Sequence, residues 1–320
     1  MTRTIILLTV IITLITPKAF ALNHALSLDG DGDYVEIKDS LSLNTLDSQV
    51  TLEAWIKPTA FPNQWMPLIY KGDKRTSDAY ENRSYTLWLN LSSGFIHFAS
   101  APNGQRQKAL NSPMGWIALS RWSHVAGVID AQGGVMKLYI NGTEVASGPY
   151  GKGIHQSALP LRIGWTHEAE KKGLSPFAGQ IDEVRIWNIA RTPSEILATM
   201  TTALTGKEAG LVGYWNFEGD GKQGIDATGH GHDGKLVGDA AIVVAEKPTA
   251  VVSGVIRNEK GRALSAAKVL LRQADARIGH FGLAVECRRT IRVGASVGAC
   301  GATSACARTV PVHFSRSPDT

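Results

Sequence analysis

Apolar and polar residues alternate along most of the chain with the period of a β-strand. Between residues 50 and 57, Val50, Leu52, Ala54 and Ile56 fall on one side and polar or aromatic residues on the other. Similar segments follow at 84–91, 94–99, 122–130, 135–141, 161–164 and 179–187. Turn residues separate them, including the tight-turn dipeptide Asn141-Gly142. Short strands divided by turns predict an all-β fold made of two antiparallel sheets.

One segment carries the signature of a helix. Thr192 can cap it, Pro193 suits the first helical position, and Glu195 stands where a capping box requires an acidic residue. Ile196 and Met200, together with Leu197, would then face a sheet. The pattern therefore predicts one short helix beside the strands.

The first 21 residues have the composition of a signal peptide. Arg3 precedes an apolar run over residues 5–15, Pro17 ends that run, and Ala19-Phe20-Ala21 offers a small-x-small cleavage site. An uncleaved membrane anchor is the alternative, but a run of about 11 residues is too short to cross a bilayer. We expect cleavage of residues 1–21, a secreted, extracytoplasmic protein, and no membrane insertion afterwards.

The segment 275–320 differs in composition from the rest. It contains six arginines and no lysine, all three cysteines, and no tryptophan or tyrosine. Small residues without a regular period cannot bury enough apolar surface to offset the entropy of ordering the chain. Two interpretations remain open, a disordered tail or out-of-frame translation after a slip near codon 275. The cysteine spacing fits no metal or disulfide framework.

The net charge of +5 belongs to the two flanks. Residues 22–274 contain 25 basic and 25 acidic side chains and are neutral. The basic character is therefore no evidence for a nucleic-acid or membrane partner, and we expect neither.

Six motifs in order resemble a known family. They lie at residues 25–37, 51–58, 122–126, 137–142, 161–164 and 177–188. Together they are similar to the laminin G-like, concanavalin A-like jelly-roll domain, and the resemblance implies a two-sheet antiparallel jelly-roll sandwich over residues 22–245. The segment 210–236 would complete this sandwich; the alternative is the start of a second copy.

A second, shorter resemblance follows a linker at Lys247-Pro248-Thr249. Residues 251–272 are similar to the first hairpin of a carboxypeptidase regulatory-like β-sandwich, and the similarity ends where the composition changes. Residues 246–274 are therefore expected to be a linker and the truncated start of such a domain.

Asp29, Asp31 and Asp33 are the best candidates for a metal site. Carboxylates at alternate positions, separated by glycine, can turn several oxygens toward one Ca²⁺. The loop is no EF-hand, because Ser40 stands where a glutamate is required. The family resemblance implies a Ca²⁺ between Asp29 and Asp182. The alternative is that these aspartates form turns and bond backbone amides.

Three histidines invite a metal or catalytic interpretation. His230 and His232 lack a third ligand, so we expect them in a solvated turn. His124 lies within a predicted strand and is expected to be packed or hydrogen-bonded there.

The candidate ligand-binding residues are aromatic side chains in or beside predicted loops, which could stack on a sugar or a peptide. They are Trp65, Tyr80, Trp116 and Trp165, and the polar loops 71–83 and 165–175 could line the site. The remaining tryptophans expected to be buried are Trp55, Trp88, Trp187 and Trp215.

These features favour a secreted, non-catalytic binding module for a carbohydrate or an extracellular protein, stabilised by Ca²⁺. A glycoside hydrolase would need two carboxylates across the scissile bond. Asp182 and Glu183 are neighbours on a strand and would point to opposite faces. A third possibility is an adhesion fragment of a larger surface protein, which the truncated second domain favours.

Overall fold

The computed structural model describes residues 23–44, 46–62, 64–74, 79–90, 94–103, 105–168, 173–219 and 221–246, and the backbone of three later strands. The chain divides into two compact units, and the body lies within the unit Leu14–Ser253. The predicted signal peptide lies outside the described residues, as do the linker and most of the carboxypeptidase regulatory-like segment.

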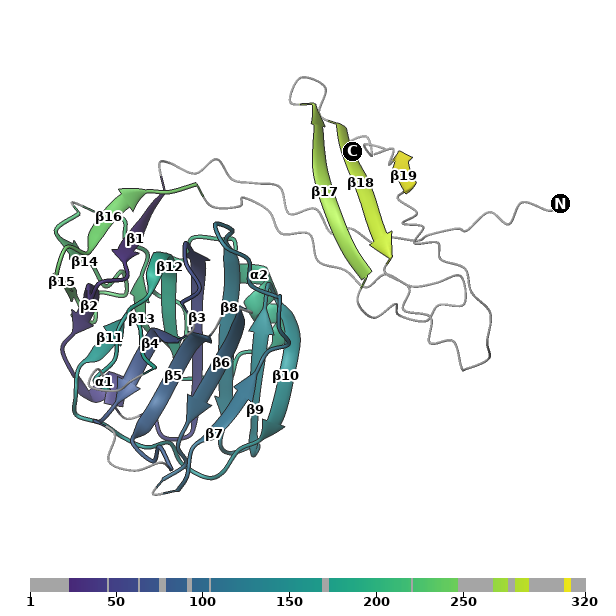
Figure 1. Ribbon diagram of the computed structural model, residues 1–320. Helices are drawn as coiled ribbons and strands as arrows, with labels where there is room; N and C mark the ends of the chain where they lie inside the picture. Colours follow the sequence, from purple (N-terminus) through teal and green to yellow (C-terminus); the bar gives the residue numbers. More distant parts are fainter. Residues whose placement is uncertain are drawn as a thin grey trace, which may run out of the picture. The chain divides into compact units, whose positions relative to one another are not determined.

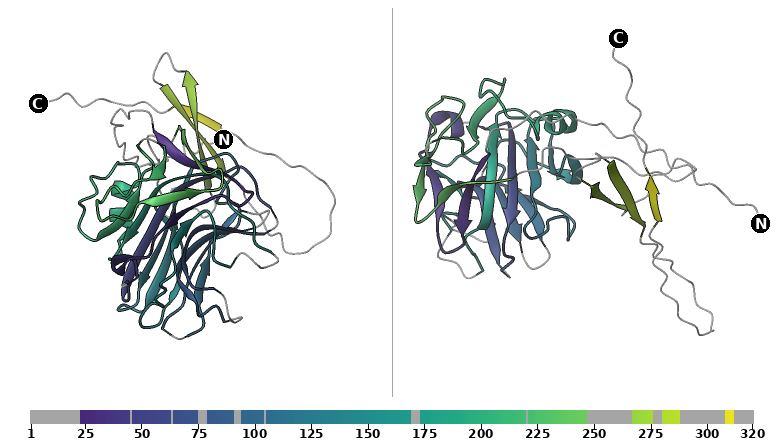
Figure 2. Two further views of the ribbon diagram at one scale, coloured as in Figure 1. Left: turned by 90° about the vertical axis from the view of Figure 1, so that its left-hand side faces the viewer. Right: turned by 90° about the horizontal axis from the view of Figure 1, so that it is seen from above.

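The body contains two antiparallel sheets (Figures 1 and 2). Across sheet A the order is β10 (Thr143–Pro149), β9 (Val135–Ile140), β8 (Ser123–Asp130), β3 (Gln49–Pro58), β12 (Ala178–Trp187), β1 (His24–Asp29) and β16 (Ala241–Val244), with β13 (Leu211–Trp215) also beside β12. Across sheet B it is β14 (Gln223–Gly224), β15 (Gly234–Val237), β2 (Tyr34–Ile37), β11 (Leu161–Ile163), β4 (Trp65–Gly72), β5 (Arg83–Asn90), β6 (Phe95–Ser100) and β7 (Lys108–Asn111).

Strands that follow one another in sequence often belong to different sheets, so the chain crosses repeatedly between the two sheets. As a result, paired strands such as β3 and β12 are far apart in sequence. The predicted fold class, an all-β two-sheet sandwich, is confirmed.

The inner faces of the two sheets form one hydrophobic core. Leu52 and Ile56 of β3 meet a cluster that includes Leu87 and Leu89 of β5 and Phe98 of β6, and all five side chains are fully buried. Each such side chain contributes about 1.5–3 kcal/mol of transfer free energy. The alternate residues of β4, β5 and β6 therefore face outward from sheet B, where ligands can approach.

Helix α2 (Pro193–Thr199) begins as predicted. The Glu195 backbone N–H donates to Thr192 Oγ1 (3.3 Å), and the Thr192 backbone N–H donates to Glu195 Oε2 (2.7 Å). Ile196 and Met200 are buried, and Leu197 is half-buried. A second helix, α1 (Leu41–Asn44), was not predicted, because a single turn is too short to show a helical period. Neither described helix has the length and apolar run needed to cross a membrane.

The segment 210–236 completes the same sandwich, as predicted. β13 pairs with β12, β15 pairs with β2, and β16 then pairs with β1. Asp226, in the connection between β14 and β15, lies beside β13. Its carboxylate accepts hydrogen bonds from the backbone N–H groups of Tyr214 (3.2 Å) and Thr228 (3.1 Å).

The prediction of a solvated turn is wrong for His232. Its side chain is buried, with Nε2 2.8 Å from Ser42 Oγ and Nδ1 3.2 Å from Asp226 Oδ2. The turn folds back onto the domain, so polar partners replace water. His230 is exposed, with Nδ1 3.0 Å from the Val212 carbonyl oxygen.

A separate antiparallel sheet contains β17 (Ala267–Asp275), β18 (His280–Cys287) and β19 (Arg308–Pro311). Two of these strands fall in the segment 275–320, for which the sequence pattern predicts no regular structure. The domain boundaries after residue 245 and the out-of-frame interpretation stay predictions.

Candidate functional site

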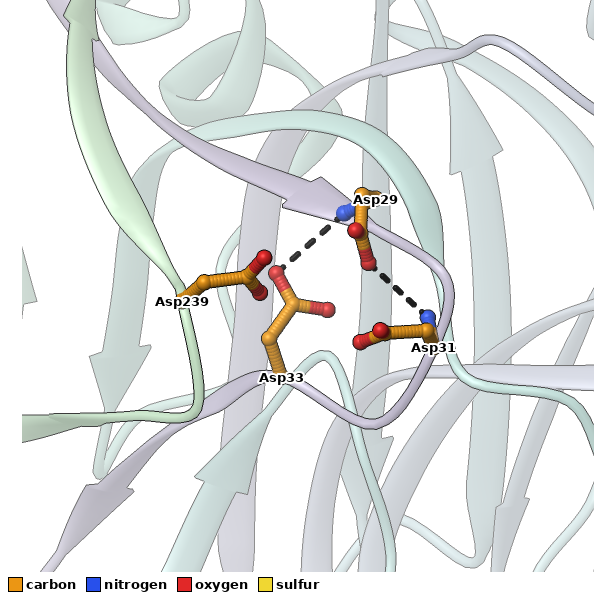
Figure 3. A group of neighbouring side chains, drawn as sticks. All are labelled: Asp29, Asp31, Asp33 and Asp239. Carbon is orange, nitrogen blue, oxygen red and sulfur yellow. Dashed lines mark hydrogen bonds between the residues drawn. The ribbon is translucent and has the colours of Figure 1, made fainter.

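The turn between β1 and β2 gathers four carboxylates (Figure 3). Asp29 ends β1, Asp31 and Asp33 follow it, and Asp239 comes from the connection between β15 and β16. One carboxylate oxygen from each lies within 4.8 Å of the other three. The two turns meet because β2 pairs with β15 while β1 pairs with β16.

Hydrogen bonds and charge repulsion shape this cluster. Asp29 Oδ1 accepts from the Asp31 N–H (2.9 Å), and Asp33 Oδ2 accepts from the Asp29 N–H (3.2 Å). Asp33 is buried, and its Oδ1 has no hydrogen-bond partner. Burial raises the pKa of Asp33, and the Asp29 carboxylate, with Asp239 adding to it, raises the pKa of Asp31.

The donor set fits a calcium ion. Two oxygens bound to one Ca²⁺ at 2.3–2.6 Å can be at most about 5.2 Å apart, so oxygens within 4.8 Å of one another can share an ion. Carboxylates are the hard ligands that Ca²⁺ accepts. Asp29, Asp31, Asp33 and Asp239 would hold the ion.

Asp182 lies outside this cluster, so the predicted pairing of Asp29 with Asp182 is wrong. In the pairing of β1 with β12, Asp29 lies opposite Ala178, and Asp182 is four residues further on, about 13 Å along the strand. The buried Asp182 carboxylate accepts from Asn23 Nδ2 (3.0 Å) and from the Glu183 N–H (2.6 Å).

Asp239 was missed because its place depends on strand pairing. Gly238-Asp239 repeats the dipeptide found at Gly30-Asp31 and Gly32-Asp33, but the same dipeptide also occurs at Gly72-Asp73 and Gly219-Asp220, so the sequence alone does not single it out.

The expected alternation at Asp182 and Glu183 is also wrong. Ile181 and Val184 both belong to the core, and the two residues between them form an irregularity in the pairing of β12 with β3. Glu183 has a φ of 53° there, and its carboxylate accepts from the Tyr214 hydroxyl (2.8 Å) and binds Arg185. A bulge of this kind interrupts the regular side-to-side order of a strand.

A second candidate site covers the outer face of sheet B. We call it the aromatic face and define it by Trp65 and Tyr70 of β4, Trp88 of β5, and Phe95 and His97 of β6. The Trp65 ring meets the rings of Trp88, Phe95 and His97 edge to face, at centroid distances of 6.5, 6.0 and 4.8 Å. The Tyr70 ring lies 5.7 Å from that of Trp88.

Polar atoms without hydrogen-bond partners lie on residues next to these rings. Asn90 stands between Trp65 and Phe95 in the pairing of β4, β5 and β6. Its side chain is completely buried, and neither Nδ2 nor Oδ1 has a hydrogen-bond partner. Trp88 Nε1 is likewise buried and unpartnered. Strands β4 and β6 are about 9.6 Å apart, whereas the rings are 6.0 Å apart, so both rings lean over β5.

His97 adds a neutral imidazole to the aromatic face. Its Nδ1 lies 2.6 Å from Asn111 Oδ1, and burial lowers its pKa to about 4. The Asn111 amide oxygen can only accept a hydrogen bond, so Nδ1 must carry the proton of the neutral ring. Nε2 is then a hydrogen-bond acceptor at neutral pH.

An ion pair fixes the border of the aromatic face. Arg83 Nε lies 3.1 Å from Glu168 Oε1, which also accepts from the Tyr70 hydroxyl (2.9 Å). The Arg83 guanidinium covers the Trp88 ring at 4.7 Å and the Tyr80 ring at 4.3 Å from their centroids. The predicted ligand residues Trp65 and Tyr80 therefore belong to one continuous set of contacts.

The other two predicted ligand residues lie at the margins. Trp165 is half-buried and follows Gly164, whose N–H donates to the Leu68 carbonyl oxygen of β4 (3.0 Å). Trp116 is 42% exposed in the connection between β7 and β8. That connection reaches the β5–β6 turn through the Ile117 N–H, which donates to the Gly94 carbonyl oxygen (3.4 Å).

Burial of the four tryptophans expected in the core is confirmed, since each is at most 2% exposed: Trp55, Trp88, Trp187 and Trp215. Trp88 is nevertheless an outward-facing residue of β5 that other rings cover, which the sequence pattern did not reveal.

The outer face of sheet A holds a buried charge network. Glu53 lies 2.5 Å from Arg191 Nη1, 3.3 Å from His124 Nε2 and 3.7 Å from Arg185 Nη1. Burial by itself would raise the pKa of Glu53, but His124 and the two arginines outweigh burial and lower the pKa to about 2. Burial lowers the pKa of His124. The prediction of a packed strand histidine is confirmed.

Comparison with known proteins agrees with this architecture. The chain is similar to a "putative carbohydrate binding protein" from Bacteroides ovatus, with 23% identity, a TM-score of 0.56, and coverage of 73% of this chain and 63% of that one. A heptameric SAP-like pentraxin from Limulus polyphemus has 17% identity and a TM-score of 0.47, over 71% of this chain and 97% of that one.

Mouse pappalysin-1 is 24% identical over 194 residues, which cover 56% of this chain. This chain spans 11% of the length of pappalysin-1. Residues 29–197, more than half of the chain, match the family model of this fold, and the chain therefore belongs to the concanavalin A-like lectin/glucanases superfamily.

Proposed function

We propose that this protein is a non-catalytic module that binds carbohydrate at the aromatic face, outside the cytoplasm. The observation that carries the proposal is the set of unpartnered polar atoms on Asn90, which lies opposite Trp65 in the strand pairing, and on Trp88, whose ring contacts that of Trp65. A sugar offers hydroxyl groups that can bond such atoms and C–H surfaces that can stack on rings. Ligand sites typically combine aromatic walls with a few polar groups in this way.

Binding requires the Trp65 ring to move aside. The ring is half-buried, and its edge-to-face contacts are worth about 0.5–1.5 kcal/mol each. The gain would come from Asn90, because an unpaired buried polar group costs about 1–3 kcal/mol and a sugar hydroxyl would remove that cost. His97 Nε2 offers a further acceptor beside Trp65.

Glu168, at the border of the aromatic face, and Glu36, on β2 of the same sheet, support a binding role over hydrolysis. Glu168 is held by Arg83 and the Tyr70 hydroxyl, and Glu36 lies 2.8 Å from Arg162 Nη2. A glycosidase needs one carboxylic acid and one carboxylate facing the scissile bond, whereas both of these groups already have cationic partners. The description of the Bacteroides ovatus relative agrees with carbohydrate as the ligand class.

A glycan array followed by calorimetry tests the proposal. We expect Trp65→Ala to weaken binding of the best glycan at least tenfold. Trp116→Ala, which removes an exposed tryptophan of the β7–β8 connection, should change binding less than twofold. Loss of binding in Trp116→Ala alone would place the site on that connection instead. Reducing ends released from β-glucans would contradict the non-catalytic role, and an array without any bound glycan would favour a protein ligand.

A further inference from the structure

The carboxylate cluster combines residues inside the family-matched segment 29–197 with one residue outside it. Asp29, Asp31 and Asp33 lie within the matched residues 29–197, whereas Asp239 lies beyond them, between β15 and β16. Figure 3 shows the four carboxyl groups turned toward a common space, with Asp33 in the middle.

Asp33 provides an observation independent of the acidic composition. Its side chain is 1% exposed, and its Oδ1 lies buried without a hydrogen-bond partner. A buried carboxylate oxygen in a native protein normally has a partner. One oxygen of the Asp33 carboxylate lies within 4.8 Å of an oxygen from each of three other carboxylates, so the partner that suits this place is a cation.

We infer that Asp29, Asp31, Asp33 and Asp239 together bind one Ca²⁺, and that this ion fastens β16 to the rest of the sandwich. β16 is the last strand in the order of sheet A and pairs only with β1 among the described strands. Its four side chains are exposed or half-buried, and Val244 is 58% exposed. Apolar burial therefore holds this strand weakly, and an ion bound by Asp239, two residues before the strand begins at Ala241, would secure it.

The same geometry predicts opposite effects of Asp239 with and without the ion. When Ca²⁺ is present, Asp239 is a ligand and its loss weakens the attachment of β16. When Ca²⁺ is absent, Asp239 is one of four like charges, and its neutralisation relieves repulsion. A residue with a merely structural role would show the same effect in both conditions.

The test uses the full chain, freed of metal by a chelator, and CaCl₂ as the probe. We expect calorimetry to show one Ca²⁺ site, a rise in Tm on adding Ca²⁺, and at least tenfold slower amide hydrogen exchange in β16. Exchange in β5, an interior strand of sheet B, should not change. Asp239→Asn should lower Ca²⁺ affinity at least tenfold, and without Ca²⁺ it should melt at or above the wild-type temperature.

Asp47→Asn is the matched control, because Asp47 is exposed and outside the cluster; it should bind Ca²⁺ as the wild type does. The inference is overturned if calorimetry detects no Ca²⁺ binding, or if Asp239→Asn lowers Tm equally with Ca²⁺ and with chelator. Slower exchange throughout the domain, without a larger effect in β16, would overturn the fastening of that strand. Carbohydrate binding at the aromatic face is measured separately and is independent of these outcomes.

Discussion

Replacing Asn90 by leucine should make the free protein more stable and abolish carbohydrate binding. The side chain of Asn90 is fully buried between Trp65 and Phe95, and both of its polar atoms lack partners. Leucine has a similar size and no polar atoms, so it would occupy the same space without an unmet hydrogen-bonding requirement. If Asn90 served stability alone, its replacement would instead lower the stability of the free protein.

The magnitude follows from the burial of Asn90. An unpaired buried polar group costs about 1–3 kcal/mol, and a volume-conserving replacement usually costs less than about 1.5 kcal/mol through imperfect packing. We therefore expect a net stabilisation of about 1–2 kcal/mol for Asn90→Leu. For a domain of 150–250 residues this corresponds to a rise in Tm of roughly 2–8 °C.

Thermal unfolding and calorimetry of the same preparations measure the two effects. The matched control is Asn188→Leu, because Asn188 is exposed in the connection that follows β12; it should change stability by less than about 0.5 kcal/mol and leave binding intact. A destabilisation of Asn90→Leu by more than about 1 kcal/mol would refute the reasoning, since it would show that Asn90 has a partner in the free protein, such as an ordered water.

Three further predictions concern stability. The pKa of His97 is lowered from 6.5 to about 4 in the folded state. The unfolded state therefore binds more protons than the folded state between about pH 4 and 6.5, so the free energy of unfolding rises with pH over this range. His97→Gln should flatten this part of a Tm–pH profile. Glu53→Gln should cost about 3–5 kcal/mol in urea unfolding, because Arg191 loses its buried carboxylate partner and Arg185 is left with Glu183; a cost below 1 kcal/mol would contradict this. Thr192→Ala should cost about 1 kcal/mol through loss of the cap, whereas Thr192→Ser should be nearly neutral.

Local patterns were sufficient to predict most of the fold. The alternation of Val50, Leu52, Ala54 and Ile56 reports directly which side of β3 faces the core, because side chains alternate along a strand. The capping box at Thr192 was equally predictable, since both of its hydrogen bonds join residues three apart. Where a structural feature depends on neighbours in sequence, the pattern is enough.

The candidate sites depend on partners that the sequence does not place together. Asp239 joins Asp29 only because two turns meet through the pairing of β2 with β15 and of β1 with β16. The assignment of Asp182 failed for the same reason, since the register of β1 with β12 decides what lies beside Asp29. Asn90 was not predicted as a ligand residue, because its place between Trp65 and Phe95 depends on the pairing of β5 with β4 and β6.

Buried polar groups elsewhere in the domain show why the unpartnered atoms of β5 point to binding. The Asp226 side chain is buried, and its carboxylate accepts hydrogen bonds from the backbone N–H groups of Tyr214 and Thr228 and from the Thr228 hydroxyl. Glu53 lies against two arginines. Both carboxylates therefore have strong partners, whereas a few other buried atoms, such as Ser84 Oγ and Trp187 Nε1, have none. Asn90 and Trp88 Nε1 have no such partners, although they adjoin a half-buried tryptophan at the surface. Stability alone gives no reason to keep an asparagine there, whereas a ligand hydroxyl supplies one.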